Sequence, residues 1–178
     1  IIAYGSKIKG ELENLQNYVQ NLEQLEQELE KVHSILMKKA RALSAARKKA
    51  GESLAIAVEK ELKDLGFLKA RFAVQLVAEP PSPAGLEAVE FLLSANPGED
   101  LKPIKAVASG GELSRIMLAL KKILAFSDMV PTLIFDEVDA GIGGAMGNVI
   151  GEKLKGLGRT HQVIAITHLP QVAARADR

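Results

Sequence analysis

Leucine recurs every seven residues near the start of the chain, at Leu15, Leu22, Leu29, Leu36 and Leu43. A second apolar line has the same spacing and consists of Tyr18, Leu25 and Val32. No Pro or Gly interrupts residues 11–50. This repeat is typical of a coiled coil, and it predicts a long helix whose partner helix can lie outside this chain. A shorter amphipathic helix packed on the rest of the chain would show a similar pattern.

The helical spacing continues beyond Gly51 and ends near Gly66. Apolar residues keep one face of this stretch hydrophobic, at Leu54, Val58, Leu62 and Leu65. Gly66 is placed to end the helix, because glycine accepts the left-handed conformation found at many helix ends. We therefore divide the chain into a coiled-coil arm with its leading helix, residues 1–66, and a second domain, residues 67–178.

Alternating apolar positions replace the helical spacing after Gly66. The two alternating runs are Phe72, Val74 and Leu76, then Val89, Phe91 and Leu93, with a proline-rich stretch between them at residues 80–85. This pattern predicts a β-hairpin with a proline-rich loop. Asn96-Pro97-Gly98 predicts a closing turn. Residues 101–108 should be irregular, because Pro103 prevents a long helix.

From Ser109 onward the order helix, apolar strand, helix, apolar strand predicts an α/β domain with a parallel sheet. The expected strands are Thr132–Phe135 and residues 163–166, both read as buried, and the second helix is expected around residues 149–157. The predicted fold class is thus α/β, with a parallel sheet and helices preceded by a hairpin and a long coiled-coil helix.

Two glycines open the first helix of the α/β part. Ser109-Gly110-Gly111-Glu112 precedes an apolar face made of Leu113, Ile116, Met117, Leu120 and Leu124. Glycines let a ligand oxygen approach free backbone N–H groups, where the helix dipole favours negative charge. A terminal phosphate suits this position. Ser109 and Glu112 also stand in the spacing of a capping box, which needs no ligand.

Two carboxylates follow the first apolar strand. Asp136 and Glu137 come directly after Phe135, at the edge where open parallel sheets bind ligands. We expect Asp136 to bind Mg²⁺ through water and Glu137 to orient and polarise an attacking water for phosphoryl transfer. Asp139 precedes a glycine-rich turn at residues 140–144, and by itself it is explained as a helix or turn cap.

The second apolar strand ends in Thr167-His168. A lone histidine is usually structural, but at the same sheet edge as Asp136 and Glu137 an imidazole can reach a γ-phosphate. His33 in the coil and His161 in a loop receive no chemical role.

Composition excludes several kinds of protein. The chain has no Cys, and therefore no disulfide, no thiolate nucleophile and no Cys-ligated zinc. No apolar run approaches the roughly 20 residues of a membrane span. The first residues lack a signal-peptide pattern and begin at Ile1 rather than Met. We expect a cytoplasmic protein and a sequence that is part of a longer chain.

A net charge of +1 conceals two segregated blocks. The acidic block consists of Glu11, Glu13, Glu23, Glu26, Glu28 and Glu30, and the basic block of Lys31, Lys38, Lys39, Arg41, Arg47, Lys48 and Lys49. Such blocks are usually solvated helix faces. A basic surface for DNA phosphates or for an acidic partner is the alternative.

In order, the motifs resemble the second half of an ABC ATPase. Their counterparts in that class are the signature motif (Ser109-Gly110-Gly111-Glu112), Walker B (residues 133–137), the D-loop (Asp139) and the H-loop (Ile166-Thr167-His168). Longer segments, at residues 108–121, 135–144 and 167–174, are similar to the RecN family of bacterial SMC-like ATPases. So are Glu90-Phe91-Leu92 and Asn96-Pro97-Gly98-Glu99. The likeness covers about residues 45–178, and Gly143 departs from it where Ser is expected.

This resemblance implies a nucleoid-associated protein that acts on DNA double-strand breaks in repair and recombination. A long antiparallel coiled coil would separate the two halves of an ATPase head, and ATP with Mg²⁺ would lie between the two heads of a homodimer. Asp136, Glu137 and His168 would serve the nucleotide of their own head. Ser109, Gly110, Gly111 and Glu112 would contact the γ-phosphate held by the other head, and Asp139 would lie across the dimer seam.

The sequence contains no P-loop, G-x-x-x-x-G-K-[ST], which an ATP site of this class also needs. The near match from Gly5 to Gly10 continues as Glu11-Leu12 and precedes a predicted helix. Family members would continue beyond Asp177-Arg178. We therefore expect the N-terminal half of the same protein to be the partner that carries the P-loop, and this chain alone to be inactive.

Three other classes are open to the sequence. Other ABC ATPase subunits, including those of transporters, share the motif order, but transporter signatures usually carry Gln where Glu112 stands. A non-catalytic coiled-coil scaffold would need only residues 11–50, and the intact Asp136, Glu137 and His168 count against it. Helicases share an Asp-Glu-x-Asp run but have no Ser-Gly-Gly-Glu helix ahead of it.

Overall fold

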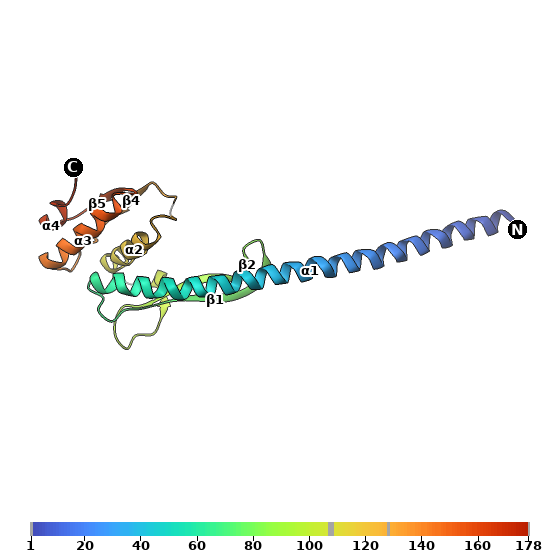
Figure 1. Cartoon of the computed structure of the whole chain (residues 1–178), viewed down its shortest axis with the longest axis horizontal. Coiled ribbons are helices and arrows are strands. Elements are labelled where there is room, and N and C mark those ends of the chain that lie inside the picture. Colours follow the sequence, from blue (N-terminus) through green and yellow to red (C-terminus); the bar gives the residue numbers. More distant parts are fainter. Residues whose placement is uncertain (1, 107–108, 128, 178) are drawn as a thin grey trace.

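The computed structural model describes residues 2–106, 109–127 and 129–177, without the side chains of residues 2–4, 6–8, 11 and 13. The predictions made for Val107 and Ala108 therefore lie outside the described residues. So do the side chains of Glu11 and Glu13, and Ile1 and Arg178 at the outer ends of the two predicted domains. Figure 1 shows a head of short elements and a long helix that projects from it.

Helix α1 (Ile2–Asp64) is that projecting helix and also enters the head. It runs through Gly5 and Gly10, so the near match to a P-loop lies inside a helix. The helix ends at Gly66 as predicted. Gly66 has a φ of 92°, and the N–H of Phe67 donates to the carbonyl of Leu62 at 3.0 Å. This is the Schellman arrangement, which satisfies the last carbonyls of a helix.

The predicted hairpin consists of β1 (Arg71–Ser82) and β2 (Gly85–Ser94). Its register pairs Phe72 with Leu93, Val74 with Phe91 and Leu76 with Val89, so the two predicted apolar runs face each other. The loop prediction was wrong in extent, because Pro80 and Pro81 belong to β1 and only Pro83 and Ala84 connect the strands. β1 pairs with β2 alone, and an edge strand tolerates proline because its outer N–H groups need no partner.

A short connection joins the hairpin to the α/β part. Asn96-Pro97-Gly98 forms the predicted turn, in which the N–H of Glu99 donates to the carbonyl of Asn96 at 3.3 Å. β3 (Lys102–Pro103) then pairs with β2, and η1 (Ile104–Ala106) is a single 3₁₀ turn. The described part of residues 101–108 has no long helix, as predicted, but it is not irregular, because β3 and η1 occupy residues 102–106.

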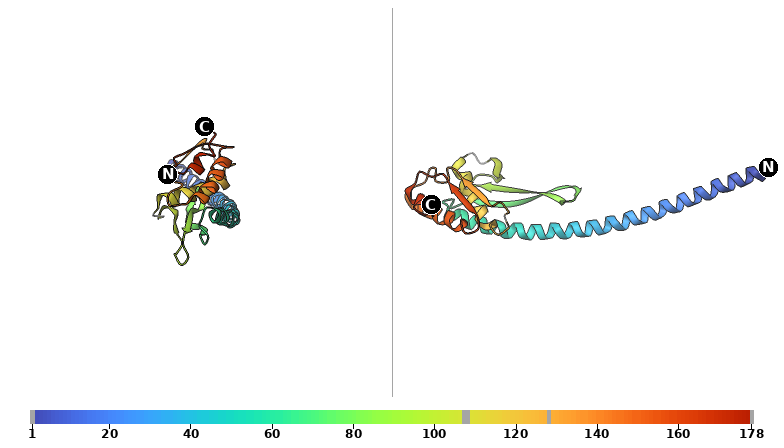
Figure 2. Two further views of the ribbon diagram at one scale, coloured as in Figure 1. Left: turned by 90° about the vertical axis from the view of Figure 1, so that its left-hand side faces the viewer. Right: turned by 90° about the horizontal axis from the view of Figure 1, so that it is seen from above.

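The hairpin lies along the head-proximal part of α1 (Figures 1 and 2). Gly51 permits this approach, because a Cβ atom placed there would lie 3.0 Å from the Cβ of Val74. The carboxylate of Glu59 accepts a hydrogen bond from the Phe72 N–H at 3.0 Å. A sheet therefore braces the end of the long helix.

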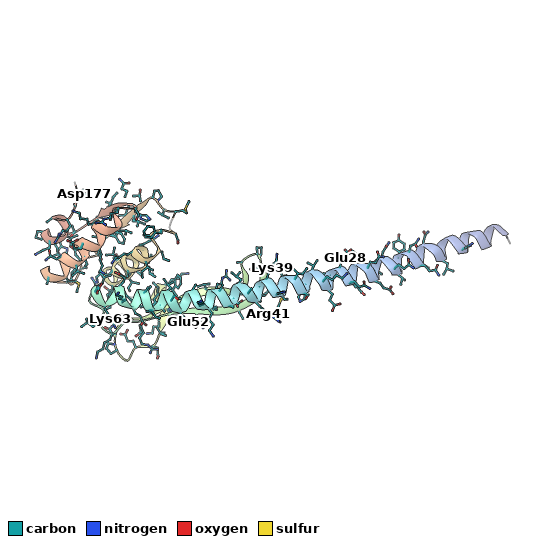
Figure 3. All side chains as sticks on the ribbon, in the orientation of Figure 1. Glu28, Lys39, Arg41, Glu52, Lys63 and Asp177 are labelled. Carbon is teal, nitrogen blue, oxygen red and sulfur yellow. The ribbon has the colours of Figure 1, made fainter. Side chains whose placement is uncertain are left out.

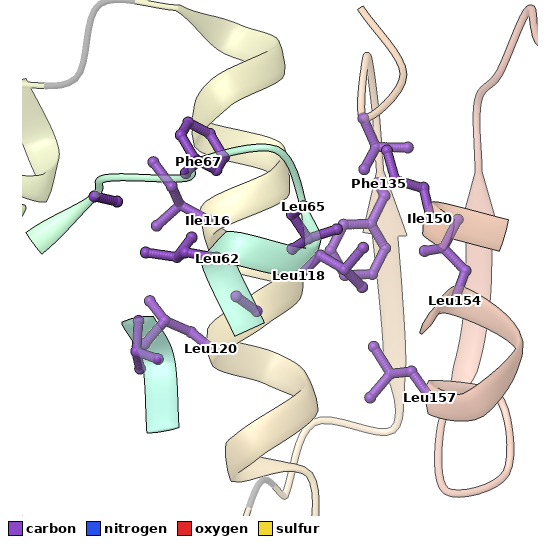
Figure 4. Close-up of a cluster of buried hydrophobic side chains, with 14 of the residues drawn as sticks. Leu62, Leu65, Phe67, Ile116, Leu118, Leu120, Phe135, Ile150, Leu154 and Leu157 are labelled. Atoms are coloured by element: carbon purple, nitrogen blue, oxygen red, sulfur yellow. The ribbon is translucent and has the colours of Figure 1, made fainter. Parts of the chain in front are cut away.

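The α/β part contains α2 (Gly110–Leu124), β4 (Thr132–Phe135), α3 (Gly144–Leu157), β5 (Gln162–Ala165) and α4 (Pro170–Ala173). β4 and β5 are parallel, with Phe135 beside Ala165. β4 has its predicted bounds, whereas β5 ends one residue early and α3 begins before residue 149. Figure 4 shows the core, which joins Leu62, Leu65 and Phe67 to Ile116, Leu118, Leu120, Phe135, Ile150, Leu154 and Leu157.

Two burial predictions were wrong. β4 and β5 are buried on one face only: Leu133 is 7% exposed, whereas Ile134 and Ile164 are 67% and 45% exposed. Among the described residues, this sheet has only two strands, and helices cover one face. On α2, Leu118 and Ala119 are buried while Met117 and Leu124 are partly exposed, because the helix is enclosed between α1 and the β4–α3 layer. In the part of the chain that the structure describes, no helix has the length and hydrophobicity of a membrane span.

Candidate functional site

The carboxyl edge of the parallel sheet brings the predicted site residues together. Asp136 and Glu137 follow β4 and are exposed, and Thr167 and His168 follow β5 two residues after its end. Because β4 and β5 run in parallel in register, both segments leave the sheet on the same side. This part of the prediction depends only on strand direction, and the structure confirms it.

Glu137 has an unusual backbone conformation. Its φ is 55°, and it is the only non-glycine residue with positive φ among those that the structure describes. An ordinary L residue adopts this left-handed conformation at a cost of about 1–3 kcal/mol, and such strain often marks functional positions. The conformation starts the turn at residues 137–140, where the N–H of Ala140 donates to the carbonyl of Glu137 at 3.0 Å.

The N-terminus of α2 lies directly against this turn. Ser109 is the N-cap, and its hydroxyl accepts from the Glu112 N–H at 3.5 Å, as the capping-box interpretation predicted. A Cβ atom on Gly110 would lie 2.9 Å from Oε2 of Glu137. One on Gly111 would lie 2.8 Å from the Cβ of Ala140. The two glycines therefore have a reason within this chain, besides access for a ligand: they let the helix end touch the carboxylate turn.

Ser114 and Arg115 fasten α2 to the same turn. The Ser114 hydroxyl donates to the backbone carbonyl of Asp136 at 2.6 Å. Nη1 of Arg115 donates to the carbonyls of Ala140 at 2.8 Å and Val138 at 3.4 Å. Both residues lie in the signature segment, but the sequence patterns assigned them no role. An arginine on the buried face of a helix is the signal that could have identified Arg115.

Arg115 is a buried cation that has no carboxylate within hydrogen-bond range among the described residues. Its side chain is enclosed, and the guanidinium stands 5.4 Å from the ring centroid of Phe67, a cation–π contact. Burial lowers the pKa of Arg115, and the nearby Glu112 charge partly offsets this. A buried charge is costly unless hydrogen bonds compensate for the lost solvation. The hydrogen bonds of Arg115 to Val138 and Ala140 therefore restrain the position of the turn.

Asp139 is oriented away from solvent, with 1% of its surface exposed. Oδ2 accepts hydrogen bonds from the Thr167 hydroxyl, from the His168 N–H at 3.0 Å and from the Leu169 N–H at 3.1 Å. This is the turn cap that the sequence allowed. Its contact across a dimer seam stays a prediction.

His168 is mostly exposed, with 71% of its side chain accessible, and its Nδ1 lies 3.3 Å from Oδ1 of Asp139. The structure therefore joins the predicted site residues in two groups. Gly110 and Gly111 lie beside Glu137, with Ser109 and Glu112 in the same helix start, while Asp139 and His168 form a pair. Asp136 is anchored through its backbone, and its side chain is open to solvent.

The donor set is compatible with Mg²⁺ only in a shared site. Among the described residues, no three His, Cys, Asp or Glu side chains gather into a metal-binding group. Mg²⁺ commonly keeps several waters and binds one or two carboxylates together with substrate phosphates. An exposed Asp136 at the sheet edge fits that mode, provided that other groups hold the phosphates.

Comparison with known proteins decides which of the predicted classes fits. No family model matches the sequence. A DNA repair protein RecN from Treponema pallidum is 41% identical over 184 residues, which include 99% of this chain and 32% of the relative. RecN from Deinococcus radiodurans is 42% identical over 99% of this chain and 31% of its own length. This chain matches the C-terminal portion of RecN.

The chain thus spans about a third of the length of these RecN relatives. Solved structures agree on the fold. An Smc head domain with a coiled coil and joint from Pyrococcus yayanosii has a TM-score of 0.51 and 27% identity, covering 71% of this chain and 23% of that one. An Smc head with an extended coiled coil from Pyrococcus furiosus has a TM-score of 0.55 at 23% identity, over 84% and 35% of the two chains.

These findings confirm the resemblance to RecN and the predicted fold class, with its long helix, hairpin and parallel sheet. The division at residue 66 remains a prediction, and α1 and the head share one core at Leu62 and Leu65.

Proposed function

We propose that this chain supplies the signature, Walker B, D-loop and H-loop half of an SMC-like ATPase head that acts in DNA double-strand break repair and recombination in the bacterial cytoplasm, at the nucleoid. The N-terminal half of the same protein supplies the P-loop, and two heads dimerise around ATP. The RecN names of the relatives and the Smc-head fold support this class over a transporter subunit or a scaffold.

The proposed roles follow from position at the sheet edge. Asp136 holds Mg²⁺ through water, and the ion, when bound, neutralises phosphate charge. Glu137 orients and polarises the attacking water. His168 points its free ring edge toward the γ-phosphate of the same head. The N-terminus of α2, residues 109–112, receives the γ-phosphate held by a second head, because its first N–H groups and the helix dipole favour an anion.

One observation carries the proposal: the N-terminus of α2 touches the residue proposed as the base. Gly110 is so close to Oε2 of Glu137 that a methyl group would collide with it. In the proposed dimer the two groups serve different nucleotides, Glu137 that of its own head and the N-terminus of α2 that of the second head, so this contact links the two ATP sites. This contact also means that a dimer partner's phosphate at α2 would be sensed by Glu137 directly.

The test combines this chain with the N-terminal half that the proposal requires. We expect ATP hydrolysis by the pair, none by this chain alone, and a fall of about 100-fold or more with Glu137→Gln, since loss of a general base costs about 10²–10⁴. The same variant should accumulate an ATP-dependent dimer, measured by light scattering. Glu79→Gln, an exposed carboxylate on β1, is the matched control and should change neither. Turnover by this chain alone that Glu137→Gln abolishes would contradict the division of the site, and unchanged turnover in the pair would remove Glu137 from the base role.

DNA enters the proposal through one face of α1. At 100° per residue, five exposed cations between residues 31 and 49 point away from the leucine seam and from the hairpin. They are Lys31, Lys38, Arg41, Lys48 and Lys49, whereas Lys39 continues the second apolar line. Leu36, Leu43 and the buried Ala40 occupy the opposite half of the helix. None of the five cations has an ion-pair partner among the described residues, whereas Arg47 pairs with Glu87. This cationic face stays open after a coil partner binds.

Charge removal tests the DNA surface. Lys38→Gln, Lys48→Gln and Lys49→Gln together should weaken binding of duplex DNA and lower the slope of log affinity against log salt by about three, because each phosphate contact contributes roughly 0.9. The control removes the same charge from the head, at Lys69, Lys105 and Lys155. Equal losses in both variants would show a response to net charge alone, and no loss in the first would remove the cationic face as the DNA surface.

A further inference from the structure

The pair formed by Asp139 and His168 has an asymmetry that a simple cap does not need. Oδ2 of Asp139 accepts from the Thr167 hydroxyl and from two backbone N–H groups. Oδ1 is also buried but accepts no hydrogen bond within the described residues. Its polar neighbour is Nδ1 of His168, at 3.3 Å. One oxygen therefore holds the backbone, and the other faces the ring.

The carboxylate remains ionised in this environment. Burial raises the pKa of Asp139, but the hydrogen bonds from Thr167, Leu169 and His168 outweigh that effect and leave the pKa below its ordinary value. An ionised carboxylate only accepts hydrogen bonds. A buried oxygen without a donor is costly, and the imidazole N–H is the group within reach that can supply one.

We propose that Asp139 is a positioning residue for His168: its Oδ1 holds the imidazole with Nδ1 protonated and turned inward, so that Nε2 faces the open sheet edge. Which nitrogen of a histidine carries the proton is set by the bond made at the other nitrogen. The inference rests on the proposed function only for what Nε2 meets there. The pairing itself concerns this chain alone.

Burial supports this assignment over a contact with a second molecule. Asp139 is 1% exposed, while 71% of the His168 side chain is accessible. The histidine can reach an incoming phosphate, whereas the polar partners of the aspartate are His168, the Thr167 hydroxyl and the backbone N–H groups of His168 and Leu169. To cross a dimer seam, the carboxylate would have to leave three hydrogen bonds within its own chain. The D-loop turn can still lie at a seam through its backbone.

Asp139→Asn separates capping from positioning. The amide oxygen can replace Oδ2 and keep accepting from Thr167 and the backbone, while the amide NH₂ replaces Oδ1 and presents a donor to the ring. A donor at that place favours a ring whose Nδ1 is unprotonated. In a serine protease triad, the equivalent change leaves the geometry intact and imposes the wrong tautomer.

The measurement is long-range ¹H–¹⁵N NMR of the histidine rings in this chain, at a pH where they are neutral. His33, exposed on α1, serves as an internal reference for an unconstrained ring. We expect His168 to be enriched in the Nδ1–H tautomer relative to His33 in the wild type, and Asp139→Asn to reverse that enrichment. A wild-type His168 with the same tautomer ratio as His33 would overturn the proposal, and this result needs no variant to fold.

Thr167→Val provides the matched comparison. It removes a donor to Oδ2 but leaves Oδ1 in place, so His168 should keep its tautomer although the cap is weakened. If Thr167→Val changes the tautomer as much as Asp139→Asn does, the effect is loss of local structure and positioning is refuted. None of these measurements uses nucleotide, so their failure would leave the Glu137→Gln test of the proposed function untouched.

Discussion

The two ends of α1 have similar apolar spacing and opposite surroundings. In the arm, Leu15, Leu22 and Leu29 are 62%, 59% and 70% exposed, whereas near the head Leu62 and Leu65 are 0% and 1% exposed. Propensity and periodicity are alike along the helix, and only the presence of neighbours differs. An apolar stripe thus shows which face of a helix can pack against a partner. The rest of the structure shows whether this chain provides that partner.

The largest expected effect breaks the buried end. Leu62→Ala should lower the free energy of unfolding by about 2–5 kcal/mol, since it removes buried methyl groups and leaves a cavity in the core. Leu22→Ala, the same change in the exposed arm, should cost less than about 1 kcal/mol in this chain. Urea denaturation measures both. Equal losses would mean that the arm is buried in solution, for example by self-association.

The ion pairs between α1 and the helices of the head should come next. Lys153 on α3 donates to Glu61 at 2.6 Å and to Asp64 at 2.8 Å, and Lys122 on α2 donates to Glu61 at 2.8 Å. Figure 3 draws the side chains on the whole ribbon, with Lys63 labelled near this end of α1. Lys153→Met should destabilise by about 1–3 kcal/mol, because it leaves Asp64, which is half exposed, without its cation and Glu61 with Lys122 alone. Lys155→Met, on the exposed side of α3, is the control and should change denaturation little.

Acid should erase the difference between Lys153→Met and the wild type. Burial raises the pKa of Glu61, yet hydrogen bonds from Lys122 and Lys153 bring it below 4.5. A hydrogen bond from Lys153 likewise lowers the pKa of Asp64 below 3.8. Carboxylates with lowered folded-state pKa values contribute stability above their unfolded values and lose it as pH falls through the folded values. The gap between the two proteins should therefore be full near pH 7 and shrink below about pH 4; a constant gap would show that packing, and not charge, makes the difference.

An effect of similar size is expected at the contact between α2 and the carboxylate turn. Gly111→Ala would place a methyl group 2.8 Å from the Cβ of Ala140 and 3.0 Å from the Glu137 carbonyl, and should destabilise by about 1–3 kcal/mol as the turn shifts. Gly156→Ala in α3 is the opposite case, with nothing within 4 Å of the added atom. It should stabilise by about 0.5–1 kcal/mol, as alanine is the better helix former. Thermal melts compare the two, and the same sign for both would contradict the packing argument.

The smallest effect on folding is expected for a change from an apolar to a charged residue in the arm. Leu29→Glu puts a charge on the arm's leucine stripe, where the side chain is 70% exposed. The unfolding free energy should change by less than about 0.5 kcal/mol. The variant should no longer associate with a partner helix that binds the wild-type arm. Sedimentation equilibrium measures the association of both. A strongly destabilised Leu29→Glu chain would place the stripe inside this chain's own fold.

Local patterns predicted the elements well where the physics is local. Strict alternation placed Phe72, Val74 and Leu76 opposite their partners, because a one-residue slip would turn each run to the wrong face. The bounds of β4 followed from the four uncharged residues before Asp136. Gly66 was recognisable as a helix end because only its position and residue type matter.

Contacts between distant segments were not predictable from these patterns. Arg115 reaches Ala140, 25 residues away, and Gly110 touches Glu137, and no spacing rule connects them. The prediction that β4 is buried on both faces failed for the same reason, since the neighbours of the strand determine which of its faces are covered. Among the site residues, the sequence identified those that carry charge at the sheet edge, and it missed those that hold the edge in place.

The hairpin determines where α1 can bend. Its tip at Gly85 reaches the side chains of Leu43 and Arg47, so the helix is supported from there to Gly66, whereas the described side chains between Leu12 and Leu36 are exposed. The unsupported stretch of some 40 residues is about 60 Å long at 1.5 Å per residue. If the helix tilts by about 10° at Leu43, the far end of this stretch moves by roughly 10 Å. Ångström-scale rearrangements in the head therefore become displacements at the tip that are comparable to the diameter of a helix.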